Sequence, residues 1–234
     1  REGLIKMRDT YRAQGVELII KGAGVTGYGE ILFAKAFGAD YHTVETVAHA
    51  EAARKVAPDV SFILDIGGQD MKAIRIQGGI VTAITLNEAC SAGCGSFLET
   101  YASSLGIPVD QIATLAFRSK NPSKLGSRCT VFMNSSIITE QKNGRTVEDI
   151  LAGLCRSIIE NVFTKVIRIP NMRTLGDKVL VQGGTFRNDA VFRALQLYTG
   201  RDVVRPPHLG LMGAIGIALL TKKQVGRKRK DKTP

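Results

Sequence analysis

The spacing of hydrophobic residues at the start of the chain predicts helices separated by short strands. Arg1–Gln14 has apolar positions at helical spacing, and Val16–Ile20 is a short β-branched run that predicts a buried strand. A short helix is expected over residues 31–40, and another over Glu45–Lys55. This succession of strand and helix indicates an α/β protein.

Three apolar runs separated by tight turns come next. Ser61–Ile66, Met71–Ile76 and Gly79–Leu86 have the composition of strands, and Gly67 and Gly68 form the first turn. Tight turns connect antiparallel neighbours. The sequence therefore predicts an antiparallel meander in this region.

Helical spacing dominates the second half of the chain. Helices are predicted over Gly95–Leu105, Pro108–Ala116, Thr146–Ile169, Asp189–Tyr198 and Gly210–Leu220. Strands are predicted over Lys178–Val181 and Asp202–Val204, and a polar loop over Arg118–Arg128. The longest of these helices carries an apolar stripe and should end at Pro170.

The composition is that of a soluble globular protein. The chain has 234 residues, of which 44% are hydrophobic and 23% charged. No apolar run approaches the length of a membrane span, and the charged N-terminus lacks the apolar core of a signal peptide. We expect a cytoplasmic protein that does not contact membranes. In a reducing compartment the four cysteines are expected to be metal ligands, redox groups or core residues.

The formal net charge of +11 raises the question of nucleic-acid binding. Much of this charge lies in Lys222–Lys232, which has the composition of a solvated tail or linker and has no interleaved aromatic residues for base stacking. The three histidines, His42, His49 and His208, lack metal-ligand spacing. We therefore expect no nucleic-acid partner.

Two predicted strands end in glycine pairs. In the first, DIGGQD, Gly67 and Gly68 allow backbone N–H groups to approach phosphate oxygens, and Asp65 and Asp70 could hold Mg²⁺ through water. A plain hairpin turn is the alternative. In the second, VLVQGGTFRND, Gly183 and Gly184 precede Asn188 or Asp189 as a helix N-cap. Two such turns suit one nucleotide held in a cleft between lobes, with phosphates at one turn and adenosine at the other.

A third glycine-rich stretch offers a different interpretation. Gly22, Gly24 and Gly27 fit the spacing G-x-G-x-x-G after a predicted strand, with Asp40 and Glu45 as candidate ribose acceptors. A lone match is a weak signal for dinucleotide binding, because any turn from a strand to a helix favours glycine.

The cysteines suggest a metal cluster. Cys90 and Cys94 would share one face of a helix that begins at or before Cys90, where amide dipoles stabilise thiolates. A cubane iron–sulfur cluster needs four thiolates. If Cys90 and Cys129 alone serve, a two-fold interface must complete the set, although Cys94 could substitute for or supplement Cys90. Cys155 lies among apolar residues of a helix and is predicted to be core.

Five segments together resemble a known family: DIGGQDMKAI, NEACSAGCGSFLE, SRCTVFMNSS, VQGGTFRNDAVFRAL and GLMGAIGIAL. They are similar to the activators of 2-hydroxyacyl-CoA dehydratases and benzoyl-CoA reductases, in particular to long versions with tandem activase domains. The resemblance implies a two-lobed actin/hexokinase-like (ribonuclease H-like) ATPase fold. Residues 1–60 would be the remainder of an incomplete first lobe, 61–221 the second lobe, and 222–234 a basic tail or linker.

The resemblance also implies functional residues. Its second phosphate motif matches Asp65, Gly67, Gly68, Gln69 and Asp70, among which the catalytic residues would be Asp65, Gln69 and Asp70. Its adenosine motif matches Gly183 and Gly184, with Asn188 beside them. Its cluster ligands match Cys90 and Cys129, so one [4Fe-4S] cluster would join two protomers or two tandem domains.

The implied activity is ATP-gated electron transfer. ATP and Mg²⁺ would drive a change between two lobe arrangements, and an electron from a ferredoxin or flavodoxin would pass to a dehydratase or related iron–sulfur reductase. The family's opening D-x-G-S-T-T phosphate loop is not found in this sequence. The chain as written is therefore expected to hydrolyse ATP poorly. A small-molecule kinase relative and a non-catalytic tandem domain remain alternatives.

Overall fold

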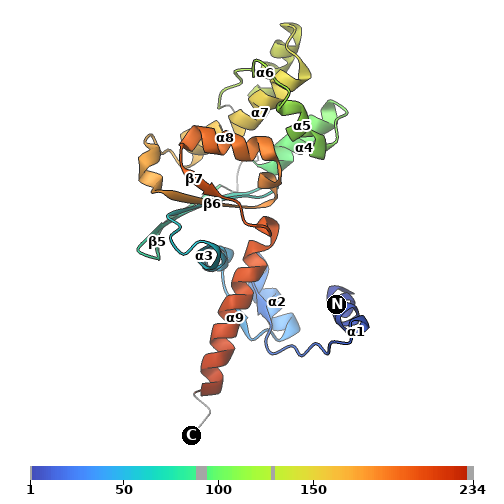
Figure 1. Ribbon diagram of the computed structural model, residues 1–234, viewed down its shortest axis with the longest axis vertical. Coiled ribbons are helices and arrows are strands. Elements are labelled where there is room, and N and C mark those ends of the chain that lie inside the picture. Colours follow the sequence, from blue (N-terminus) through green and yellow to red (C-terminus); the bar gives the residue numbers. More distant parts are fainter. Residues whose placement is uncertain (1, 88–93, 128–129, 231–234) are drawn as a thin grey trace.

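A five-stranded mixed sheet lies at the centre of the computed structural model, which describes residues 2–87, 94–127 and 130–230 (Figure 1). The strands are β3 (Phe62–Ile66), β4 (Met71–Gln77), β5 (Ile80–Asn87), β6 (Lys178–Gln182) and β7 (Asp202–Val204), in the order β5-β4-β3-β6-β7. The predicted meander is confirmed, because β3, β4 and β5 pair antiparallel. On the other side of β3, the strands β6 and β7 are added in parallel.

Helices cover both faces of the sheet. The α-helices of the described residues are α1 (Glu2–Ala13), α2 (Glu30–Phe37), α3 (Glu45–Val56), α4 (Gly95–Ser104), α5 (Ile112–Ala116), α6 (Thr130–Lys142), α7 (Val147–Asn161), α8 (Asp189–Thr199) and α9 (Met212–Lys230). Shorter helical turns span Val109–Gln111, Val162–Val166, Met172–Leu175, Gly184–Arg187 and Leu209–Leu211. Figure 1 shows α4, α5, α7 and α8 on one side of the sheet, with α3 and the start of α9 on the other.

The central strand β3 is buried along its whole length because both of its faces are covered. Successive side chains of a strand point to opposite faces. Phe62, Leu64 and Ile66 join the larger core beneath α4, α5, α7 and α8, whereas Ile63 joins a smaller core against α3. The same alternation directs Asp65 to the α3 side of the sheet.

Small residues allow α3 and α9 to approach closely. A Cβ atom on Gly216 of α9 would lie 1.8 Å from the carbonyl oxygen of Ala48 in α3. Ala48 itself has no exposed surface. A Cβ atom on Gly213 would lie 3.2 Å from Nε2 of His49. Glycine at position 216 is therefore a condition for this helix crossing.

The predicted buried strand over Val16–Ile20 is wrong. These residues form neither a strand nor a helix, and Val16, Ile19 and Ile20 are 48%, 66% and 60% exposed. A β-branched run becomes a buried strand only when a neighbour supplies backbone partners and a covering layer, and no other described segment pairs with this one. The two-stranded parallel sheet nearby instead joins β1 (Gly24–Val25) to β2 (Tyr41–His42), with α2 between them.

Most predicted helices are confirmed, with changes at their ends. The helix predicted from Thr146 begins after it, because the Thr146 side chain accepts a hydrogen bond from the backbone N–H of Asp149. The last helix was predicted to end at Leu220 but continues to Lys230, so most of the basic run is helical. Among the described residues, no helix is long and apolar enough to cross a membrane.

The crossing of α3 and α9 can be tested with Gly216→Ala. Since the added methyl group would overlap the Ala48 carbonyl, we expect a loss of about 1–3 kcal/mol in the free energy of unfolding, measured by urea denaturation. Gly226→Ala in the same helix is the control, because its Cβ atom would meet nothing within 4 Å. It should gain up to about 1 kcal/mol from helix propensity. Equal stability of the two variants would contradict the close crossing.

Candidate active site

The two glycine turns lie side by side because β3 and β6 are parallel neighbours. Asp65 at the end of β3 is in register with Gln182 at the end of β6. Gly183 follows directly with φ of 85°, and a Cβ atom there would lie 2.2 Å from the carbonyl oxygen of Ile66. Only glycine fits such a backbone conformation at that distance. The hydroxyl of Thr185 donates to the carbonyl oxygen of Gly67 at 2.9 Å, which joins the second turn to the first.

Helix α4 begins directly on the first glycine turn. The backbone N–H groups of Gly95 and Ser96 donate to the carbonyl oxygens of Gly67 and Gly68 at 2.9 and 2.8 Å. Cys94 is the N-cap of this helix and is fully buried. Helix α4 therefore begins at Gly95. The prediction that Cys90 and Cys94 share one helix face required this helix to begin at or before Cys90, and α4 does not meet that condition.

The predicted cluster ligands Cys90 and Cys129 lie outside the described residues. Among the residues that are described, no group of three or more His, Cys, Asp or Glu side chains could hold a metal ion. Cys155 is buried in the core, as predicted, and burial raises the pKa of its thiol to about 12. It therefore remains a neutral thiol under ordinary conditions.

Two open cavities adjoin the glycine turns. The first has a volume of about 690 Å³. Its lining is Tyr28, Glu45, His49, Asp65, Gly67, Gln69, Asp70, Lys72, Gly183, Gly184, Leu209 and Gly210. The second, of about 530 Å³, lies at the start of α4 and α8 and includes Gly68, Ser96, Glu99, Asp110, Arg187 and Asn188. Gly184 lines both, so the cavities meet at the second glycine turn.

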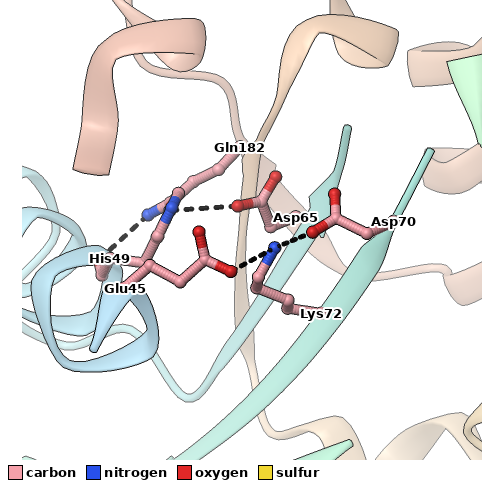
Figure 2. A network of polar contacts seen from close by, with 6 residues as sticks. All are labelled: Glu45, His49, Asp65, Asp70, Lys72 and Gln182. Carbon is pink, nitrogen blue, oxygen red and sulfur yellow. Dashed lines mark hydrogen bonds and ion pairs between the residues drawn. The ribbon is translucent and has the colours of Figure 1, made fainter. Parts of the chain in front are cut away.

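A polar cluster forms one wall of the first cavity (Figure 2). Asp65, Lys72 and Gln182 lie on the α3 face of three neighbouring strands, with Asp65 in register with both of the others. Residues four apart share a helix face. Glu45 and His49 of α3 accordingly point together toward these three side chains, as Figure 2 shows.

Hydrogen bonds and ion pairs join the members of this polar cluster. Nδ1 of His49 lies 3.0 Å from Oδ2 of Asp65 and also contacts Oε1 of Gln182. The Gln182 amide donates to the backbone carbonyl of His49 at 3.1 Å. The Lys72 ammonium lies 3.0 Å from Oε1 of Glu45 and is paired with Asp70. One helix thus contacts the carboxylate of β3 directly and the carboxylate of the turn through Lys72.

Burial and charge act in opposite directions on the two central ionisable groups. Burial raises the pKa of the Asp65 carboxyl above its ordinary value, although His49 and Lys72 oppose this effect. Burial alone would lower the pKa of Lys72, but the hydrogen bonds that its ammonium donates to Asp70 and Glu45 outweigh this effect and raise that pKa. The cavity wall therefore holds a buried carboxyl beside a firmly charged lysine.

Most of the predicted nucleotide residues converge in the structure. Asp65, Gly67, Gln69, Asp70, Gly183 and Gly184 line the first cavity, and Gly68 and Asn188 line the second. The side-chain oxygen of Asn188 accepts from the backbone N–H groups of Ala190 and Val191, so the N-cap prediction is confirmed for this residue.

Sequence reasoning did not place four members of the polar cluster at this site: Glu45, His49, Lys72 and Gln182. For Lys72, strand alternation across the hairpin was an available signal, since it pairs with Asp65. The spacing of Glu45 and His49 placed them on one helix face, but nothing local indicates what that face covers.

The alternative of a dinucleotide fingerprint at Gly22, Gly24 and Gly27 is wrong. That fingerprint follows the end of a strand, but here the strand begins at Gly24. The Asp40 carboxylate accepts a hydrogen bond from the backbone N–H of Ala23 at 2.8 Å. Glu45 is paired with Lys72 at the other site. The two candidate ribose acceptors therefore have partners in separate parts of the structure.

The central sheet, the adjacent glycine turns and the crossing helices define an actin/hexokinase-like fold, as predicted, and solved structures of activator ATPases share it. The chain belongs to the BadF/BadG/BcrA/BcrD ATPase family, which matches residues 3–221. The family predicted from the five sequence segments is thereby confirmed.

Two relatives and one solved structure illustrate the similarity. The chain is 31% identical to the 2-hydroxyisocaproyl-CoA dehydratase activator of Clostridioides difficile, over 91% of this chain and 77% of that protein. It is 33% identical to the (R)-2-hydroxyglutaryl-CoA dehydratase activating ATPase of Acidaminococcus fermentans, over 81% of this chain and 71% of that protein. The structure of the Clostridium difficile activator with bound ADPNP matches with a TM-score of 0.83 at 30% identity, covering 97% of this chain and 83% of that one.

The buried carboxyl predicts a measurable dependence of stability on pH. A carboxyl with a higher pKa in the folded state binds its proton more tightly there, so stability falls as pH rises from about 4 through the folded pKa. Asp65→Asn should remove this loss. We expect the variant to be more stable than the wild type at neutral pH by about 0.5–2 kcal/mol, measured by urea denaturation across pH.

Asp59→Asn is the control for this prediction. Asp59 is exposed and bonded to Lys178, which lowers the pKa of its carboxyl, so its substitution should lower stability at neutral pH instead. The Asp59→Asn variant retains Asp65 and should still lose stability as pH rises above about 4. The same loss in Asp65→Asn would contradict the prediction.

Proposed function

We propose that this protein is an ATP-dependent reductive activase that binds ATP with Mg²⁺ across the two glycine turns. We further propose that it carries a [4Fe-4S] cluster at an interface between subunits or domains. The observation that carries this proposal is the direct attachment of α4 to the first glycine turn. Through the Gly95 and Ser96 N–H groups, the helix that follows Cys90 and Cys94 is bonded to the turn predicted to bind phosphate.

The first cavity suits the phosphates and their metal ion. Gly183 keeps the backbone free of a side chain where the two turns approach one another, and Gly67 leaves room for the Asp70 side chain within the first turn. Mg²⁺ retains several waters and is commonly held by one or two carboxylates together with substrate phosphates. Asp65 and Asp70 fit that requirement, and the bound ion would neutralise phosphate charge. Gln69 has both a donor and an acceptor, which is the combination that orients an attacking water.

The second cavity suits the adenosine. It begins at Gly184, where the phosphate cavity ends, and its lining offers the carboxylates of Glu99 and Asp110 as hydrogen-bond acceptors for hydroxyl groups. Arg187 and Asn188 add donors to the same lining. A nucleotide spanning both cavities would pass over the start of α4.

The cluster would be held by Cys90 and Cys129, with Cys94 as a possible third ligand from the sequence. Thiolates of two chains or two domains would supply the four ligands, and such a cluster supplies one-electron chemistry when bound. Cys94 is buried at the N-cap of α4, which favours a role in fixing the start of this helix. Movement of the first glycine turn would then move the helix beside the cluster.

The partner would be a 2-hydroxyacyl-CoA dehydratase or a related iron–sulfur reductase. The names of the two relatives support this assignment, because both are activators of CoA-ester dehydratases. A ferredoxin or flavodoxin would supply the electron, and a homodimer or tandem pair would complete the cluster. These reactions would take place in the cytoplasm.

Gly184→Val tests the nucleotide site without straining the fold. A Cβ atom at this position would meet nothing within 4 Å, yet the side chain would enter the space shared by the two cavities. We expect the Kd for MgADP, measured by isothermal titration calorimetry, to rise at least about tenfold, with an unchanged melting temperature. Gly226→Val, far along α9, should bind as the wild type does. Unchanged affinity in Gly184→Val would count against this nucleotide path.

Iron analysis tests the cluster. After anaerobic reconstitution we expect a brown protein with about two irons per chain, since one four-iron cluster would be shared by two sets of ligands. Cys90→Ala and Cys129→Ala should lose iron, whereas Cys155→Ala should retain most of it because Cys155 lies in the core. A colourless wild-type protein would contradict the cluster.

A further inference from the structure

His49 occupies a position where the helix crossing meets the candidate active site. Its backbone belongs to α3, next to Ala48, whose carbonyl oxygen lies against Gly216 of α9. Its side chain points from α3 into the polar cluster and is mostly buried (Figure 2). His49 therefore connects the packing of two helices with a carboxylate in the nucleotide cavity.

The hydrogen bonds determine which ring nitrogen carries the proton. The Gln182 amide nitrogen donates to the backbone carbonyl of His49, so the Gln182 oxygen faces the His49 ring. Nδ1 therefore has two acceptors beside it, Oε1 of Gln182 and Oδ2 of Asp65. With Asp65 ionised, only an N–H group at this position satisfies both acceptors. His49 must donate from Nδ1.

The Asp65 carboxylate is consequently held from two sides. Oδ2 faces Nδ1 of His49 at 3.0 Å, and Oδ1 faces the second glycine turn, where a Cβ atom on Gly183 would lie 2.4 Å away. The carboxylate side chain is 7% exposed. A hydrogen bond to one oxygen of a buried carboxylate fixes its rotation and leaves the other oxygen in a defined direction.

We propose that His49 is a positioning residue, which orients Asp65 toward the metal–nucleotide complex by donating a hydrogen bond from Nδ1. This inference rests on the proposed nucleotide function. Because α9 fixes the height of α3 over the sheet, the direction of Asp65 depends on the contact between the two helices. A displacement of α3 along α9 withdraws the donor from the carboxylate.

Three substitutions distinguish the donor from mere bulk. The amide nitrogen of Asn is as many bonds from the backbone as Nδ1, whereas that of Gln is one bond farther, like Nε2. His49→Asn therefore keeps the proposed donor, His49→Gln displaces it and His49→Ala removes it. Asn and Gln are both polar amides, so a difference between these two variants cannot arise from loss of polarity in the cluster.

The measurement is the gain in ADP affinity on adding Mg²⁺, taken as the ratio of Kd in EDTA to Kd in Mg²⁺. We expect this ratio to be unchanged in His49→Asn. In His49→Gln and His49→Ala it should be smaller by roughly tenfold. The Kd of each variant in EDTA is its own reference, so any general loss of ADP affinity cancels in the ratio. Melting temperatures would establish that each variant is folded.

The outcomes separate the two proposals. If the Asn, Gln and Ala variants behave alike, His49 is not a positioning residue, although the nucleotide function stands. If the wild type binds no ADP or gains nothing from Mg²⁺, the proposed function fails and the role of His49 fails with it.

Discussion

The need to match a buried carboxylate governs the arrangement of the site. Asp65 is 5% exposed, and an ionised group in such a place is strongly unfavourable unless donors surround it. Its donor His49 comes from α3, and the amide of Gln182 that orients His49 comes from β6. The carboxylate thereby requires three elements to be correctly placed at once. Burial of Asp65 lowers the stability of the fold. The same burial favours one position of α3, because only there does His49 reach the carboxylate.

Small residues place these elements close enough for that network. Ala48 and Gly216 bring the backbones of α3 and α9 into contact. Farther along α9, the Thr221 hydroxyl lies so close to Gly24 of β1 that a Cβ atom on this glycine would be 2.0 Å from it. Helix α9 therefore contacts the backbone of α3 directly at Gly216, and its Thr221 and Ile217 side chains pack against Gly24 of the small β1–β2 sheet. It connects the central sheet to the segment that contains α2, as Figure 1 shows. Such contacts transmit displacement well because a packed interface does not deform continuously.

Local patterns were sufficient to predict the five strands of the central sheet and the glycine turns, since turn glycines and β-branched runs act over a few residues. The pattern did not predict α6 as a helix, because apolar Phe132 and Ile138 are exposed while Met133 and Ile137 are buried. The strand predicted over Val16–Ile20 was wrong for the opposite reason. Its residues have a strong local strand preference, but no described segment pairs with them. The hairpin register could indicate Lys72 beside Asp65, but His49 and Gln182 could not be placed in the polar cluster from neighbouring residues, because they meet only through tertiary packing.

The parallel pairing of β3 with β6 has a consequence for the order of folding. The hydrogen bond between the two glycine turns spans 118 residues, and that between Gln182 and His49 spans 133. Contacts of this sequence separation form slowly, because the entropy of closing long loops is lost before any pairing compensates for it. The meander of β3, β4 and β5 involves only short loops and can form early. The site proposed to bind a nucleotide across both turns is therefore completed late in folding, and the rate at which it forms reports the docking of β6 rather than the formation of the hairpins.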